Sequence, residues 1–273
     1  MLQARSWLPR TEGSLRLELA RSGSATRLEV LRQEGASRAR FPRAPEGAPP
    51  EVVLINMAGG LTGGDHIDLQ VTLQPGAEAS VTTAAAEKIY RAQEGEATIR
   101  ARLSIGEGAR LAWLPQPTIL FDRSRLDRHT EVELAGNANF LGVETLIFGR
   151  TAMGEDVHRG ACRDAWRIRR DGALIFADAF RLDGAVAAVL DRPATLAGAR
   201  ATAMLIYVAT DAAARLDAAR AVFDHAQSVI GVSTWNGMLV ARAAARDGQI
   251  LQADIARLVQ LLSGQPPPRV WQC

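Results

Sequence analysis

Three carboxylates stand inside apolar stretches of this sequence, where their charge needs an explanation. Glu144 lies in FLGVETLIFG, Asp178 lies in ALIFADAF, and Glu87 precedes Lys88 in VTTAAAEKIY. An ionised carboxylate is costly to bury unless it is paired or solvated. Each of them therefore faces solvent from an edge strand, a counter-charge such as Lys88 or an arginine, or a wet internal cavity. A pair of them could also serve glycoside hydrolysis, which requires a separation of about 5 to 10 Å that a sequence does not give.

The run GGLTGGDHI, residues 59–67, is the most conspicuous motif. A phosphate-binding P-loop needs Lys and then Ser or Thr after its last glycine, whereas here Asp65 follows and its carboxylate would repel phosphate. The glycine spacing of a dinucleotide-binding turn is absent too. Two interpretations stay open: a tight turn that needs positive φ angles, or a place where the backbone approaches a partner or an ion beside Asp65. The glycines concerned are Gly59, Gly60, Gly63 and Gly64.

Residues typical of nucleophilic catalysis or tight metal binding are poorly represented. The sequence has no G-x-S-x-G elbow. Cys162 follows His158 by four residues in the polar segment HRGAC, where a small buried thiol is the simpler interpretation. The four histidines form no close pair, and neither Cys162 nor Cys273 belongs to a C-x-x-C motif. The sequence therefore shows no catalytic constellation and no tight, permanent metal site.

Alternating apolar and polar residues predict strands over most of residues 14–210. Three segments in this region are similar to one another: LQPGAEASV from Leu73, IGEGARLAW from Ile105 and LAGNANFLG from Leu134. Each has an aliphatic residue, a turn with glycine, an alanine and a second apolar stretch. Such a period indicates either stacked strand–turn–strand units or three ordinary hairpins.

Helical spacing replaces this alternation after Thr210. Apolar residues at 216, 219, 223, 226 and 230 predict a helix that Thr210 or Asp211 caps and Gly231 ends. Apolar residues at 251, 255, 258 and 262 predict a second helix, from an N-cap at Asp247 to Gly264. We expect one domain over 1–273, with a β-rich body over about 1–210 and an α+β portion over about 211–273.

Composition excludes several classes of partner. The net charge of +2 gives no electrostatic footprint for nucleic acid or anionic lipid. No stretch approaches the roughly 20 apolar residues that a membrane-spanning helix needs. Two cysteines imply no disulfide framework and favour a reducing compartment. We therefore expect a cytoplasmic protein.

Six segments carry a resemblance to a known family. They are GGLTGGD at 59–65, TTAAAEKIYRA at 82–92, GARLAWLPQPTILFD at 108–122, FLGVETLIFGRTAMGE at 140–155, RDGALIFAD at 170–178 and PPRVW at 267–271. In this order and spacing they resemble the urease accessory proteins called UreD or UreH, from about residue 50 to the end. The sequence departs from the family's pattern in having Asn56-Met57-Ala58 where His-Pro-Pro is frequent and Ala84–Glu87 where Pro-Gly-Ala is common before the lysine. Both departures weaken any histidine-based metal site.

The resemblance implies a mainly β fold, a β-helix-like stack of strands with two α-helices in the C-terminal third. It also implies a protein that is not an enzyme. Such a protein binds urease apoprotein and, with UreF and the GTPase UreG, helps nickel to reach the urease active site. No tightly bound cofactor is implied. Ni²⁺ would instead pass transiently along an internal wet route, whose acidic residues fall by position on Asp65, Glu87, Glu144 and Asp178.

Two further classes of function stay open. A β-solenoid enzyme that acts on carbohydrate through paired carboxylates would need an aromatic groove, yet aromatic residues make up only 5% of the chain. A purely structural interaction module would use the same interfaces without any metal route.

Partner contacts are expected at apolar, rigid segments near turns. Trp113 and Pro115 lie in WLPQP, and Arg269 and Trp271 lie in PPRVW. The alternative for Trp113 is burial at the end of a strand.

Overall fold

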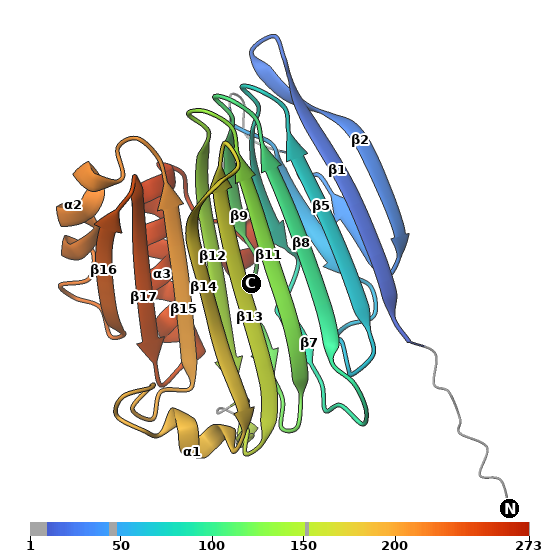
Figure 1. The fold of residues 1–273 in the computed structure, drawn as a ribbon, viewed down its shortest axis with the longest axis vertical. Coiled ribbons are helices and arrows are strands. Elements are labelled where there is room, and N and C mark those ends of the chain that lie inside the picture. Colours follow the sequence, from blue (N-terminus) through green and yellow to red (C-terminus); the bar gives the residue numbers. More distant parts are fainter. Residues whose placement is uncertain (1–9, 44–47, 151–152, 273) are drawn as a thin grey trace, which may run out of the picture.

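The computed structural model describes residues 10–43, 48–150 and 153–272, so Cys273 lies outside the described residues. Within these ranges the chain forms two β-sheets, with its N-terminal strands at one end of the molecule and its C-terminal strands at the other (Figure 1). Sheet A has seven strands, in the order β14 (Ala173–Gly184), β13 (Gly160–Arg170), β11 (Arg125–Leu134), β8 (Ala97–Ile105), β5 (His66–Leu73), β1 (Glu12–Ser22) and β2 (Ala25–Gly35).

Sheet B has ten strands within the described ranges. Its main path runs in the order β16 (Val229–Trp235), β17 (Met238–Ala245), β15 (Ala201–Val208), β12 (Asn139–Phe148), β9 (Arg110–Leu114), β6 (Glu78–Thr83), β4 (Glu51–Asn56) and β3 (Ser37–Arg40). Two short strands lie off this path: β10 (Thr118–Leu120) pairs with β12, and β7 (Glu87–Ile89) pairs with β10.

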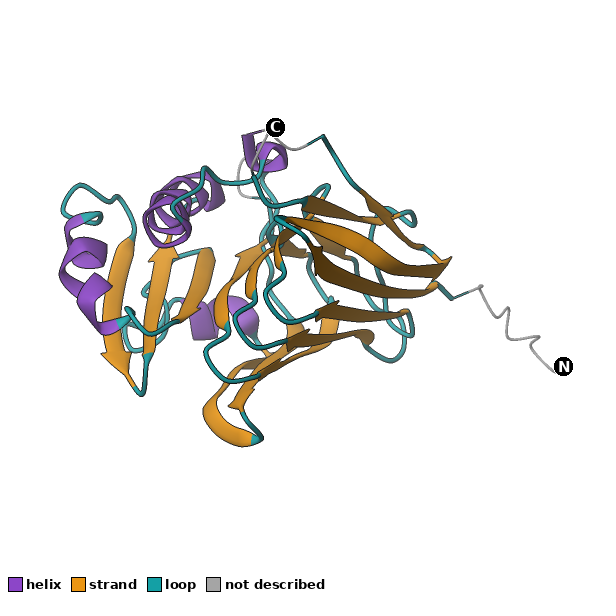
Figure 2. Ribbon diagram, turned by 90° about the horizontal axis from the view of Figure 1, so that it is seen from above, coloured by secondary structure: helices purple, strands orange, loops and turns teal. Residues whose placement is uncertain are grey.

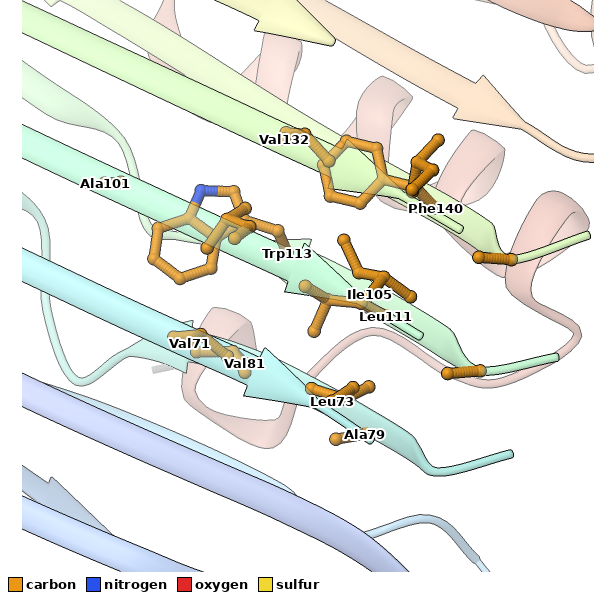
Figure 3. Packing of buried hydrophobic residues seen from close by; sticks show 14 of the residues in the cluster. Val71, Leu73, Ala79, Val81, Ala101, Ile105, Leu111, Trp113, Val132 and Phe140 are labelled. Atoms are coloured by element: carbon orange, nitrogen blue, oxygen red, sulfur yellow. The ribbon is translucent and has the colours of Figure 1, made fainter. Parts of the chain in front are cut away.

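The three similar segments are stacked turns that carry the chain from one sheet to the other. Strands β5, β8 and β11 pair in parallel in sheet A, and β6, β9 and β12 pair in parallel in sheet B. Leu73 is in register with Ile105, and Ile105 with Leu134. Side chains from successive turns therefore stack between the sheets, as Figure 3 shows for Leu73 and Ile105 beside Leu111. The stacked interpretation is confirmed and the hairpin interpretation is wrong, because the strands that flank each turn belong to different sheets.

The inward residues of this stack form most of the core. Leu15, Leu17 and Leu19 of β1 alternate with more exposed residues, as the period of two predicts. Outward positions of sheet A carry opposite charges on neighbouring strands, including the ion pairs Arg102–Asp68 and Arg100–Asp127, each with its closest atoms within 2.7 Å. The predicted β-helix-like stack of strands is thus the observed fold.

Strand β12 is buried on both faces, which explains why its sequence is mostly apolar apart from Glu144 and Thr145. Leu141 and Val143 pack under helix α3 (Gly248–Ser263), whereas Phe140 and Leu146 face the space between the sheets. Helix α3 contacts β15 and β17 and lies on the side of the C-terminal strands in Figure 2.

The second predicted helix is confirmed as α3. The Asp247 carboxylate accepts hydrogen bonds from the backbone N–H groups of Gln249 and Ile250 at 2.7 and 3.1 Å. Gly264 ends the helix in the left-handed conformation at φ 68°. Leu251 and Ile255 lie on its buried face.

The first predicted helix is mostly wrong. Only the 3-10 helix η2 (Ala213–Arg215) and α2 (Leu216–Ala221) are helical, and Ile230 and Gly231 belong to strand β16. Pairing with β17 decided the outcome there, because the β-branched run from Val229 suits a strand. Asp211 does not cap the helix; its carboxylate instead accepts hydrogen bonds from Tyr207 Oη and Arg215 Nε, both at 2.8 Å.

Two short helical elements were not predicted. They are α1 (Val186–Leu190) and the 3-10 helix η3 (Arg269–Gln272). None of the helices in the described ranges combines the length and the apolar character of a membrane-spanning helix.

Candidate functional site

Two of the four predicted carboxylates, Glu144 and Asp178, line one cavity between the sheets. Glu144 is on the inner face of β12 and Asp178 is on β14 of sheet A. The cavity has a volume of about 60 Å³, more than the ~10–15 Å³ that a water molecule needs. Asp164 and Arg242 also line it. The stack therefore holds a water-sized space that is lined by charged and apolar side chains, as the wet-cavity alternative required.

Arg128 is the centre of a buried ion cluster beside this cavity. Its Nε and Nη2 donate to the two carboxylate oxygens of Asp164 at 3.1 and 2.8 Å. Its Nη1 lies 2.7 Å from Glu144 Oε1 and donates to Thr118 Oγ1 at 2.8 Å. The Arg128, Asp164 and Glu144 side chains are only 5 to 7% exposed. The cluster joins β11 and β13 of sheet A to β12 of sheet B.

Strand register places these groups opposite one another. Arg128 and Asp164 are directly paired on β11 and β13. In sheet B, Glu144 is paired with Met204, and Met204 with Arg242 of β17. Two rows of side chains therefore face each other across the gap between the sheets.

A second ion pair lies at the exposed side of the cavity. Arg242 Nη2 lies 2.8 Å from Asp178 Oδ1, and the two side chains are 59% and 23% exposed. This pair also crosses from sheet B to sheet A, because β17 and β14 belong to different sheets.

Sequence reasoning missed Arg128 and Asp164, although a signal was present. Arg128 follows Leu126 and precedes Thr130 and Val132 in the inward, alternating positions of β11. Asp164 holds the matching inward position of β13, two residues before the buried Trp166. A charged residue in phase with buried neighbours indicates a buried charge. This signal lies in the alternation along a strand and not in a continuous apolar run.

Burial controls the protonation of the cluster. Desolvation raises the pKa of Glu144 above its usual range; Arg128 opposes the rise and Asp164 adds to it. The pKa of Arg128 is raised by Asp164 and Glu144 against the effect of burial. Burial, with some help from Asp164, raises the pKa of the Cys162 thiol to about 12. Cys162 is therefore protonated at neutral pH and unsuited to metal binding.

The raised pKa of Glu144 predicts a pH-dependent stability. Between its ordinary pKa of 4.5 and its folded-state value of about 8, the folded chain binds a proton that the unfolded chain releases. This contribution to stability is therefore complete below about pH 4.5 and is lost as the pH rises towards 8. We expect Glu144→Gln to flatten this decline in urea denaturation measured from pH 5 to pH 8. An unchanged slope would contradict the assignment.

Glu87 lies near this cluster but does not line the cavity. Asn56 Nδ2 donates to both of its carboxylate oxygens, at 3.1 and 3.2 Å. Its strand β7 pairs with β10, in which Thr118 is bonded to Arg128. Burial raises the pKa of Glu87, and Asn56, Arg128 and Lys88 partly offset the rise.

Asp65 does not line this cavity and instead organises the glycine turn. Its two carboxylate oxygens accept hydrogen bonds from the backbone N–H groups of Thr11 and Thr62, both at 2.8 Å. The side chain is buried, at 4% exposure. Gly59 and Gly64 have φ angles of 73° and 90°, which favour glycine. The local geometry is that of the tight turn.

Gly60 and Gly63 are needed for close packing. A Cβ at Gly60 would lie 2.9 Å from the carbonyl oxygen of Lys88, and one at Gly63 would lie 2.2 Å from that of Glu94. The turn thus packs directly on β7 and on the segment that follows it.

The predicted partner contacts differ in exposure. Trp113 is 5% exposed and packs in the core beside Val81 and Phe140 (Figure 3), so the buried alternative holds for it. Pro115 is half-buried. Trp271 is half-buried too, and its Nε1 donates to the Leu114 carbonyl at 3.2 Å. Arg269 is exposed, and its charge lowers the pKa of Glu51, which burial raises more strongly.

Comparison with known proteins decides the family. The family model described as "UreD urease accessory protein" matches residues 11–272. The chain belongs to the UreD family. The urease accessory protein UreD of Xanthobacter autotrophicus is 48% identical over 262 residues, which are 96% of this chain and 90% of that protein. UreD of Azorhizobium caulinodans is 44% identical over 96% of both chains, and UreD of a Methylobacterium species is 46% identical over 98% and 97%.

Membership of the UreD family makes this chain a urease accessory protein, and its relatives carry the name of an accessory protein and not of an enzyme. Within the part of the UreD chain that the structure describes, no three His, Cys, Asp or Glu side chains are arranged to hold a metal ion. The carboxylates at the cavity are held by arginines instead.

Proposed function

We propose that this UreD-family protein helps to insert nickel into urease by letting Ni²⁺ pass transiently through the cavity between its sheets. It would act in the cytoplasm on urease apoprotein, together with UreF and the GTPase UreG. The observation that carries the proposal is the convergence of Glu144, Asp164 and Asp178 on one internal cavity.

The chemistry of the cavity suits weak binding. Carboxylate oxygens and water bind Ni²⁺, but imidazole and thiolate bind it more tightly. A route must release the ion as readily as it accepts it. Carboxylates beside a water-sized space, with the neighbouring Cys162 thiol protonated, meet this requirement. The buried urease site would then draw the ion onward.

Carbohydrate hydrolysis is not favoured. A glycosidase needs one carboxylic acid and one free carboxylate flanking the substrate. Here Asp164 is bound through both oxygens by Arg128, and the cavity is far too small for a sugar ring.

The proposal is tested by co-expression with a urease gene cluster that lacks its own UreD-type gene. The wild-type chain should restore urea hydrolysis and nickel content in the purified urease. We expect Glu144→Gln with Asp178→Asn to lower both about tenfold, a typical loss when a polar partner of a metal ion is removed. Glu133→Gln is the control, because Glu133 lies on the outer face of β11 with its side chain 50% exposed.

Co-purification of the variant with urease separates the two remaining interpretations. A loss of nickel with the complex intact supports a metal route. Full activation by the double variant would show that the chain acts only as a structural interaction module.

A further inference from the structure

Two arginines form ion pairs with the carboxylates that line the cavity, and the two arginines differ in how exposed they are to solvent. Arg128 is buried and fixed by Asp164, Glu144 and Thr118, whereas Arg242 is 59% exposed and, among the carboxylates that the structure describes, pairs with Asp178. Both guanidinium groups lie within 2.8 Å of a cavity-lining carboxylate oxygen. Each therefore stands where a cation bound by these oxygens would stand.

We propose that Arg128 and Arg242 are resident counter-cations, which keep the carboxylates of the cavity from retaining a divalent metal ion. This inference rests on the proposed passage of Ni²⁺. A cation that approaches Asp178 or Glu144 must either displace a guanidinium or share its oxygens against the repulsion of a full positive charge. The affinity of the cavity is thus lowered by the chain itself.

The exposure of the two arginines assigns them different roles. Arg242 can turn from Asp178 into solvent, because more than half of its side chain is already exposed. It is the exchangeable cation at the entrance. Arg128 has no such freedom, because three side chains bind it and its own side chain is buried. It holds both oxygens of Asp164 and lies against Oε1 of Glu144, so Glu144 can share an oxygen with a passing ion only when its proton leaves.

The groups around this pair set the balance of charge. Facing the cavity and the cluster are the carboxylates Glu144, Asp164 and Asp178, the two arginines and the Cys162 thiol, with Glu87 beyond Thr118. With both arginines in place and Glu144 protonated, the charges of Asp164 and Asp178 are balanced. Removal of either arginine leaves an uncompensated carboxylate.

The test measures Ni²⁺ binding by the purified full chain, with nickel sulfate alone, by equilibrium dialysis at pH 7.5. Arg242→Gln should bind Ni²⁺ at least about tenfold more tightly than the wild type, because one repulsive charge is removed at contact distance. The gain should disappear in Arg242→Gln combined with Asp178→Asn.

Arg102→Gln is the matched control. Arg102 pairs with Asp68 on the outer face of sheet A at 2.7 Å, with side-chain exposures of 48% and 24% that are close to those of Arg242 and Asp178. It should bind Ni²⁺ no more tightly than the wild type. An equal gain in Arg102→Gln, or no gain in Arg242→Gln, would overturn the proposal.

Arg128→Met tests the inner position through a second readout. Its buried carboxylates lose their partner, so Ni²⁺ should raise its melting temperature while it leaves that of the wild type unchanged. If Arg128→Met folds and Ni²⁺ does not change its melting temperature, the inner role of Arg128 is contradicted. If this variant does not fold, Arg242→Gln decides alone.

These assays contain no urease. A binding gain in a chain whose carboxylate variants still activate urease fully would leave this inference standing and reject the nickel route.

Discussion

Asp164→Ala is expected to lower the free energy of unfolding by about 3 to 5 kcal/mol, a large share of the stability of an ordinary domain. Arg128 would lose both hydrogen bonds to Asp164 and stay buried at the junction of β11, β13 and β12. Glu144 would remain as its one carboxylate partner, so the pKa of Glu144 should fall once the repulsion of Asp164 is gone. Urea denaturation at pH 7.5 measures the loss.

Asp178→Ala is the matched control for this result. Asp178 also pairs with an arginine at the same cavity, but that arginine is 59% exposed and can be solvated. We expect a loss of about 1 kcal/mol or less. Equal losses in the two variants would mean that burial does not set the strength of these ion pairs.

Gly63→Ala is expected to destabilise the chain by about 3 kcal/mol through a steric conflict. The new Cβ would lie 2.2 Å from the carbonyl oxygen of Glu94 and 2.9 Å from that of Gly95. Backbone of two segments would have to separate, and the bonds that Asp65 makes to Thr11 and Thr62 hold one of them in place. The midpoint of urea denaturation and the rate of proteolysis near residues 92–95 should both report the change.

Gly59→Ala separates crowding from backbone conformation. Gly59 belongs to the same turn and has a φ of 73°, yet no atom lies within 4 Å of a Cβ added there. Its loss should be about 1 kcal/mol, the usual cost of a left-handed conformation for alanine. A loss as large as that of Gly63→Ala would show that the left-handed conformation at Gly59 costs as much as the contact with Glu94 at Gly63.

Much of the fold could be read from local patterns. The alternation of Leu15, Leu17 and Leu19 identified β1, and the shared pattern from Leu73, Ile105 and Leu134 indicated three similar units, whose stacking the strand register decided. Asp247 and Gly264 marked the ends of α3, because caps act within one turn of their own position. Local patterns failed around Ile230, where pairing with a neighbouring strand outweighed helical spacing.

The candidate site could be predicted only in part. The positions of Glu144 and Asp178 in apolar stretches predicted that each needs a partner or a wet cavity, and both line the cavity. Glu87, the third carboxylate in an apolar stretch, is bonded to Asn56 instead, and Asp65 of the glycine motif is bonded within its own turn. Arg128, which pairs with Glu144, and Asp164, which repels it, are 16 and 20 residues away on other strands, so no spacing rule connects the three.

The sequence by itself determined the family, the strand periodicity and the turns, because each depends on residue types at short separations. Only the tertiary structure decided which carboxylates share a space. That choice follows from the register of parallel strands in two facing sheets, which brings Arg128, Asp164 and Glu144 within contact and leaves Asp65 at its turn. Charge pairing across a core is a property of three-dimensional distance, and the stacking of the β-sheets sets that distance.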